Sequence, residues 1–280
     1  MKKIFVISFI MVILSIAIVS YKQANGSCPE TNFNDYQSIK DTTMKYVLHK
    51  ANTRGEFEGG WLKARYSFSF NTYYDPARMN FGVLRVLNDD RIDPAKGFGT
   101  HPHDNMEIIT IPLQGAVEHK DNMGNHGIIR AGDVQVMSAG KGVRHSEVNP
   151  SSKDTLKLLQ IWVFPNKKDV QPRYQQMNGI TNDIPVNTFK KLVAPDDEKA
   201  LFVYQNVVFS MGEFKAGART EYNIAYKGNG VYVFIIEGNA KINGVDVTRR
   251  DGIGIWNTDK LQIEIQDNSK ILLMDVPMIN

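Results

Sequence analysis

Cysteine is almost absent from this sequence: its 280 residues include one, Cys28. An intramolecular disulfide is therefore excluded, and packing, helped by any bound metal, has to hold the fold together. Cys28 also lies near the N-terminus rather than in the body of the chain, which argues against a catalytic thiol. Long stretches with a 3.6-residue apolar period are missing as well, so we expect helices to be minor.

A strong charge of one sign is missing too. The formal net charge is only +3, and no block of five or six like charges occurs. This balance gives no support for a nucleic-acid partner. The hydrophobic fraction, 42% of 280 residues, is enough for one large core or for two domains of ordinary size.

The first residues have the pattern of an export signal. Lys2 and Lys3 precede an almost wholly apolar run, Ile4–Val19, and the small residues Ala24 and Gly26 occupy the −3 and −1 positions of a candidate cleavage site. The apolar run is shorter than the roughly 20 residues that a membrane-spanning helix needs. The pattern therefore favours a signal peptide that is cleaved.

Two alternatives to cleavage stay open. Residues 1–26 would serve as an uncleaved membrane anchor, or Cys28 would carry a lipid, although Asn25 is a poor fit three residues before it. In each case the folded part lies outside the cytoplasm, in the periplasm or the extracellular space, and only this segment contacts a membrane. Residues 27–44 are expected to form a linker.

From about Lys45 onward, short apolar or alternating runs are separated by turn-forming residues. Many short strands at close spacing predict an all-β barrel or sandwich. The expected strands include Phe81–Leu87, Glu107–Leu113, Val134–Met137, Leu156–Val163, Phe202–Phe209, Val231–Ile236, Ile253–Trp256 and Ile271–Val276. The expected turns include Asn88–Asp90, Asn122–Asn125, Ala131–Asp133, Lys227–Gly230 and Asn243–Gly244.

A weak internal repeat divides this region. Leu113–Val117 leads through a turn to Arg130–Asp133, and Ile236–Ala240 leads through Asn243–Gly244 to Arg250–Gly252. Each half has the pattern of a strand, a glycine corner, a hairpin and a second glycine turn, which predicts two barrels of one type in tandem. We expect the barrels at residues 45–165 and 199–280, joined by a polar, proline-containing connector at residues 166–198.

All six histidines lie between His49 and His145, so an imidazole metal site is expected only in the N-terminal barrel. His101 and His103 are two residues apart, which places both on one face of a strand. Pro102 between them cannot donate a ladder hydrogen bond. This strand is therefore expected to be an edge strand or to begin here.

A second pair with strand spacing, His145 and Glu147, follows a turn that contains Gly140 and Gly142. On facing strands the two pairs would surround one cation with three neutral imidazoles and one carboxylate. These ligands suit Fe(II), Mn(II), Co(II), Ni(II), Cu(II) or Zn(II), and they leave a position for water or substrate. A single strand histidine is most often an ordinary hydrogen-bonded residue, but two such pairs beside glycine turns favour a metal site over a structural cluster.

The histidine pairs belong to longer motifs, Gly97–His103 with Met106–Ile108, Leu113–Asp121 and Gly132–Glu147. Further motifs lie upstream at Gly60–Trp61, Ser67–Phe70, Tyr73–Pro76 and Leu84–Asp90. Together they resemble the pirin family of bicupins from about Lys45 to Pro277, and most closely the bacterial pirin-like quercetin dioxygenases. The resemblance implies two tandem cupin barrels, each a double-stranded β-helix or jelly roll, with metal ligands in the first alone.

The family resemblance also implies a ligand set. The family's ligands are the two histidines of His-Pro-His and the His and Glu of His-Ser-Glu, which fall here on His101, His103, His145 and Glu147. Glu107 lies where most other cupins place a Glu ligand, and the resemblance implies a position beside the metal rather than on it. The N-terminal segment departs from the family, whose members are mostly cytosolic or nuclear, and this argues against a role in transcription.

The activity that the resemblance implies is the opening of a flavonol ring with O2, which releases carbon monoxide, at one divalent metal ion with Fe(II) favoured. The metal would bind the flavonol 3-hydroxyl oxygen and lower its pKa, and Glu147, with Glu107 second, would take the proton. Continuing the strand alternation beyond His103 makes Ile109 and Ile111 face the same way as the histidines, and with Met137 they would hold the flat ring or, taken singly, form ordinary barrel core. The alternatives are a non-catalytic metal-binding or redox-sensing regulatory or binding protein, and another metal-dependent cupin activity.

Overall fold

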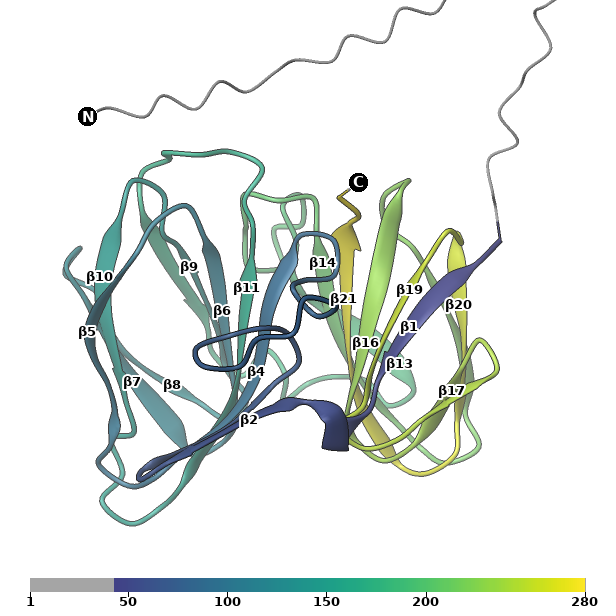
Figure 1. The fold of residues 1–280 in the computed structure, drawn as a ribbon, viewed down its shortest axis with the longest axis horizontal. Coiled ribbons are helices and arrows are strands. Elements are labelled where there is room, and N and C mark those ends of the chain that lie inside the picture. Colours follow the sequence, from purple (N-terminus) through teal and green to yellow (C-terminus); the bar gives the residue numbers. More distant parts are fainter. Residues whose placement is uncertain (1–42, 280) are drawn as a thin grey trace, which may run out of the picture. The chain divides into compact units, whose positions relative to one another are not determined.

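The computed structural model describes residues 43–279. Within these residues the regular structure is almost entirely β, with 21 strands and a single 3-10 turn, η1 (Ala51–Thr53). The strands form the two barrels that the sequence predicted (Figure 1). No helix of this described part is long and apolar enough to span a membrane. The expectations for residues 1–26 and for most of the linker lie outside the described residues.

The N-terminal barrel consists of a seven-stranded and a four-stranded antiparallel sheet. The larger sheet has the order β12 (Arg173–Met177), β9 (Val134–Ser138), β6 (Glu107–Gln114), β11 (Leu156–Val163), β4 (Leu84–Ile92), β3 (Leu62–Tyr66) and β2 (Gly55–Gly59). The smaller sheet has the order β5 (Gly97–His103), β10 (Val143–Val148), β7 (Ala116–Asp121) and β8 (His126–Arg130). β5 is an edge strand, as Pro102 predicted.

The C-terminal barrel repeats this arrangement with a six-stranded and a four-stranded sheet. The larger sheet has the order β1 (Lys45–His49), β19 (Gly252–Trp256), β16 (Asn229–Glu237), β21 (Ser269–Pro277), β14 (Val208–Phe214) and β13 (Thr188–Val193). The smaller sheet has the order β15 (Arg219–Asn223), β20 (Lys260–Ile265), β17 (Ala240–Ile242) and β18 (Val245–Val247). The hairpin between β17 and β18 turns at Asn243 and Gly244, both with positive φ, as expected for this pair.

The boundaries of the two barrels differ from the expected ones. β1 lies at the start of the region expected to form the N-terminal barrel, yet it pairs with β19 of the C-terminal barrel, with Tyr46 opposite Ile255. β19 would otherwise present an unpaired edge, and β1 covers it. The expected connector, residues 166–198, contributes β12 to the first barrel and β13 to the second.

Two expected elements were wrong. The expected turn Asn88–Asp90 is the middle of β4, where Asn88 lies opposite Gln160 and Asp90 opposite Leu158 of β11. These polar residues lie in a strand because Asn88 and Asp90 face the barrel interior, where they are 3% and 6% exposed. The expected strand Phe202–Phe209 begins only at Val208, because its first residues have no partner strand in the described part of the chain.

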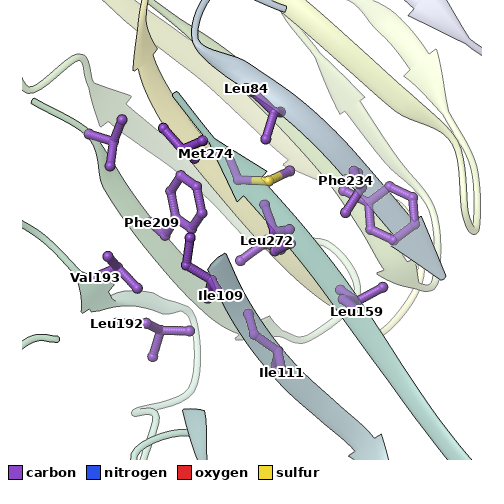
Figure 2. Packing of buried hydrophobic residues seen from close by; sticks show 14 of the residues in the cluster. Leu84, Ile109, Ile111, Leu159, Leu192, Val193, Phe209, Phe234, Leu272 and Met274 are labelled. Carbon is purple, nitrogen blue, oxygen red and sulfur yellow. The ribbon is translucent and has the colours of Figure 1, made fainter. Parts of the chain in front are cut away.

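The two larger sheets pack against each other through an apolar core (Figure 2). Ile109 of β6 and Leu159 of β11 meet Phe209 of β14 and Leu272 of β21, and all four side chains are fully buried. Because side chains alternate along a strand, this core uses one face of each larger sheet and leaves the other face for the barrel interior.

The barrel interiors differ in polarity. The inner residues of the C-terminal barrel form one apolar cluster that runs from Val231 on β16 to Ile263 on β20. In the N-terminal barrel two apolar clusters, around Leu158 and around Ile108, occupy the ends. Between them lie buried polar side chains from six strands: Asn88, Asp90, Thr110, His119, Gln135, His145, Glu147 and Gln160. The histidine site therefore lies in a polar belt inside the first barrel.

Candidate metal centre

β5 presents the first pair of predicted ligands. His101 and His103 lie on the same face of the strand, with their ring centroids 4.9 Å apart. Antiparallel pairing with β10 places His101 directly opposite His145. The edge position of β5 accommodates Pro102, which has no N–H to donate to a neighbour. The His-Pro-His motif therefore directs both imidazoles towards β10.

β10 presents the second pair. His145 and Glu147 both face the barrel interior, where they are 1% and 3% exposed. The turn that leads into β10 requires glycine, because Gly140 has a φ of +48° and a Cβ there would collide with the carbonyl of Val170. This turn places β10 beside β5 (Figure 1).

The three predicted histidine ligands converge. The ring centroid of His145 is 4.4 Å from that of His101 and 4.9 Å from that of His103. One ligand nitrogen from each ring lies within 4.8 Å of the others, close to the spacing around a single first-row metal ion. His101, His103 and His145 thus form one candidate set of ligands.

A further histidine lies at the same place. His119 on β7 is fully buried, and its Nδ1 lies 3.4 Å from Nδ1 of His145. His119, His145 and Glu147 form a second set with ligand atoms within 4.8 Å, so His145 belongs to both sets and Glu147 to the second. The Nε2 of His119 contacts Asp121 at 3.1 Å, which fixes the ring. His119 was not expected at the site from the sequence, although its two-residue spacing from Asp121 was a signal.

His103 and His145 are held in the neutral form that binds a metal. Burial, followed by the neighbouring His101, His103 and His119, lowers the pKa of His145 to about 2. Burial and His101 likewise lower the pKa of His103 to about 4. The Nδ1 of His101 lies 2.8 Å from the carbonyl oxygen of Gly99 and donates to it, which leaves Nε2 as the lone-pair nitrogen.

One buried atom of His145 indicates that the site suits a cation. Its Nε2 is buried and has no hydrogen-bond partner among the described residues. A buried polar atom without a partner costs free energy, so an external group is expected to satisfy it. Three neutral imidazoles and an adjacent carboxylate are suitable donors for a divalent transition-metal ion.

Glu147 is oriented by two neighbours from the larger sheet. Thr110 Oγ1 donates to its Oε1 at 3.2 Å, and Gln160 Nε2 donates to its Oε2 at 2.8 Å. Burial raises the pKa of Glu147 above its ordinary value, so a bound cation would favour the ionised form that burial disfavours. Thr110 and Gln160 were not expected at the site from the sequence, because neither belongs to a metal-binding motif.

The histidines open onto a cavity of about 170 Å³. Its lining combines the predicted ligands with aromatic, aliphatic and polar side chains: Phe70, Asn88, Asp90, Phe98, His101, His103, Ile108, His145, Glu147, Gln160 and Trp162. Burial, with nearby Asp89 and Glu147, raises the pKa of Asp90 to about 8. The site thus combines candidate metal ligands with a partly aromatic wall, as small-molecule sites do.

Glu107 and the expected apolar wall lie elsewhere. Glu107 accepts a hydrogen bond from Ser138 Oγ at 2.7 Å and does not line the cavity. Ile109 and Ile111 belong to the core between the barrels (Figure 2), so the expectation that they hold a substrate ring was wrong. The physical reason is the turn after His103. It ends the strand, so the alternating direction of the side chains along that strand does not continue beyond the turn. Met137 is buried behind the cavity rather than in its lining.

Comparison with known proteins identifies the family. The Pirin family model matches residues 48–163, and the model described as "Quercetinase C-terminal cupin domain" matches residues 192–276. A protein of Escherichia coli (strain K12) named "Quercetin 2,3-dioxygenase" is 42% identical over 234 residues, which are 83% of this chain and 99% of that protein. The chain belongs to the pirin family.

Other pirins extend the comparison. The "Pirin-like protein" of Caulobacter vibrioides is 40% identical over 223 residues, 79% of this chain and 95% of that protein. A crystal structure of the E. coli bacterial pirin YhhW in complex with nickel(II) superimposes with a TM-score of 0.79 at 40% identity, covering 84% of this chain and all of the other. Thus a similar pirin binds a divalent transition metal, the class of ion that suits the histidine cluster here.

Proposed function

We propose that this pirin is a metal-dependent dioxygenase of the quercetin 2,3-dioxygenase type, which opens a flavonol ring with O2 and releases carbon monoxide. The observation that carries the proposal is the convergence of His101, His103 and His145, with a buried unpartnered Nε2 on His145, at a partly aromatic cavity. The names of the similar bacterial proteins support the same activity.

The proposed ligands are His101, His103, His145 and Glu147, with Fe(II) favoured among Fe, Mn, Co, Ni, Cu and Zn. When bound, the metal supplies a Lewis acid that lowers the pKa of a coordinated hydroxyl group. His119 would support the site from β7, because it contacts His145 and is itself held by Asp121.

Glu147 is the proposed proton acceptor. Its two oxygens are fixed by Thr110 and Gln160, so the carboxylate has a defined orientation towards the cavity. A carboxylate whose pKa is raised by burial is a stronger base than an exposed one, and this favours transfer of the 3-hydroxyl proton of a flavonol to an oxygen of Glu147. Glu147 is only 3% exposed, so little bulk water reaches its carboxylate.

The substrate would enter beside the aromatic residues of the wall. Trp162 packs edge-on against His103 at 4.9 Å and against Phe70 at 5.3 Å, and Phe98 packs against His101 at 6.3 Å. These rings flank the histidines and offer flat apolar surface to an aromatic ligand. A cavity of about 170 Å³ is small for a whole flavonol, so part of the ligand would extend beyond it.

The test is an assay with quercetin after the apoprotein is loaded separately with Fe, Mn, Co, Ni, Cu or Zn. We expect O2-dependent loss of flavonol absorbance together with carbon monoxide, and loss of both signals in Glu147→Gln protein. Turnover by none of the metal-loaded forms would contradict the dioxygenase proposal and would favour a metal-binding protein without turnover.

We also propose that residues 1–26 direct the chain out of the cytoplasm, on the basis of the pattern at its N-terminus. Mass spectrometry of protein from its own host would identify the mature N-terminus. Fractionation that finds the protein only in the cytoplasm, with residues 1–26 retained, would contradict export.

A further inference from the structure

The cavity beside the histidines contains polar groups that the proposed metal site does not use. Asn88 and Asp90 line it from β4, and Trp162 lines it from β11. Asn88 Oδ1, Asp90 Oδ1 and Trp162 Nε1 are all buried without a hydrogen-bond partner among residues 43–279. Most buried polar atoms in folded proteins are paired, so three unpaired atoms around one cavity require an explanation.

Asp90 is the clearest of the three. Asp90 is only 6% exposed, and its Oδ1 is buried without a hydrogen-bond donor among the described residues. The carboxyl of Asp133, buried to a similar extent at 7% exposed, instead accepts from the backbone N–H groups of Arg130 and Gly179. A buried carboxyl oxygen without a donor costs free energy unless a bound group supplies one.

These residues are adjacent to the proposed ligands. Asn88 and Asp90 are two residues apart on β4, so both face the interior together. Asn88 lies opposite Gln160, whose Nε2 donates to Glu147. Trp162, two residues beyond Gln160 on the same strand, packs against His103. The unpaired oxygens, the indole N–H and the histidines therefore face one space.

We propose that Asn88 and Asp90 form a hydroxyl-binding subsite that accepts hydrogen bonds from a polyhydroxylated aromatic ligand, while Trp162 donates one to a ligand oxygen. This inference rests on the proposed function, because it assigns the substrate class of the same cavity. The aromatic wall binds the ring, and the subsite selects rings that carry hydroxyl groups. Asn88, Asp90 and Trp162 are thus specificity-determining residues for this reaction.

The experiment compares two flavonols that share the 3-hydroxyl group. Quercetin carries four further hydroxyl groups, and 3-hydroxyflavone carries none. Dissociation constants are measured anaerobically on metal-loaded protein by titration of the flavonol absorbance, and kcat/KM is then measured in air. The variants are Asp90→Leu and Asn88→Leu, each of which removes the acceptor. The matched control is Gln135→Leu, which removes a buried unpaired amide of the same barrel outside the cavity lining.

We expect the wild-type protein to bind quercetin more tightly than 3-hydroxyflavone. Asp90→Leu and Asn88→Leu should each weaken quercetin binding by about 10–100-fold and 3-hydroxyflavone binding by less than about threefold, because a lost acceptor matters only to a ligand that has the donor. Gln135→Leu should leave the ratio between the two ligands unchanged. Metal content and thermal unfolding of each variant show whether its site and fold are intact.

Equal losses for both flavonols would overturn the subsite, because they would show that Asp90 and Asn88 act through the metal or the fold. Equal wild-type affinity for the two flavonols would also overturn it. Selective binding of quercetin that depends on Asp90, without turnover in air, would instead refute the dioxygenase and leave the subsite standing.

Discussion

Glu107 gives a sharp test of the geometry, because the sequence and the structure assign it different surroundings. The sequence suggested a position beside the metal, whereas in the structure Glu107 is 1% exposed, accepts from Ser138 and lies outside the cavity lining. Burial raises the pKa of its carboxyl to about 7, from an ordinary value of 4.5. The substitution Glu107→Gln removes this titration and keeps an oxygen for Ser138.

The magnitude follows from the shift in pKa. A carboxyl with a raised native pKa holds its proton longer in the folded than in the unfolded state, so its stabilising contribution is complete below pH 4.5 and is lost as the pH rises through about 7. The difference of 2.5 units between these two values corresponds to about 3 kcal/mol at pH 8.5. Glu107→Gln should therefore match the wild type near pH 4.5 and exceed it by up to that amount at pH 8.5.

Urea unfolding of wild-type and variant protein, both without metal, measures the free energy of unfolding across this pH range. The difference between the two proteins isolates Glu107, because every other titrating group is shared. A difference independent of pH would refute the assigned burial of the ionised carboxylate. Activity is the second readout: loss of flavonol turnover in Glu107→Gln protein, with metal content unchanged, would refute the placement of Glu107 outside the site.

Three further outcomes follow from the same structure. His119→Gln should lower metal affinity by about 10–100-fold, measured by competition with a chromogenic chelator, because His119 contacts the proposed ligand His145; unchanged affinity would contradict this. Phe209→Ala should reduce the free energy of unfolding by about 3–5 kcal/mol, since it leaves a cavity in the core between the barrels. A loss below about 1 kcal/mol in urea unfolding would contradict that packing. Asp89→Asn should cost about 3 kcal/mol, because Arg54, with a side chain 4% exposed, would lose its ion-pair partner; an unchanged thermal midpoint would show that the pair is dispensable.

The fold was largely predictable from local pattern. Alternating runs such as Lys260–Ile265 bury every second residue, and Asn243–Gly244 makes the expected tight hairpin. The pairing of β1 with β19 was not predictable, because it joins residues about 200 positions apart and no local feature encodes it. The convergence of His101, His103 and His145 was expected from strand spacing, while their status as metal ligands stays a prediction.

Expectations from the sequence were wrong where the lining of a cavity competes with local propensity. Asn88–Asp90 has the composition of a turn, but its polar residues lie in a strand because they line a cavity and join an ion-pair network. Ile109 was expected at the site because the alternating side-chain direction of the His103 strand was assumed to continue across the turn that follows His103. A one-residue change of phase moves a whole strand to its other face, and the sequence alone does not show where such a change occurs.

The two barrels explain why one of them can contain a polar site. A barrel with Asn88, Asp90, His119 and His145 buried inside forgoes much of the apolar burial that stabilises its neighbour, which contains one large apolar cluster. The larger sheet of the first barrel recovers burial on its outer face, where Ile109 meets Phe209 of the second barrel. The C-terminal barrel thus supplies packing to the sheet that carries Thr110, Gln160 and Trp162. On this argument, substitutions in the core between the barrels should weaken metal binding as well as stability, although that core has no contact with the metal site.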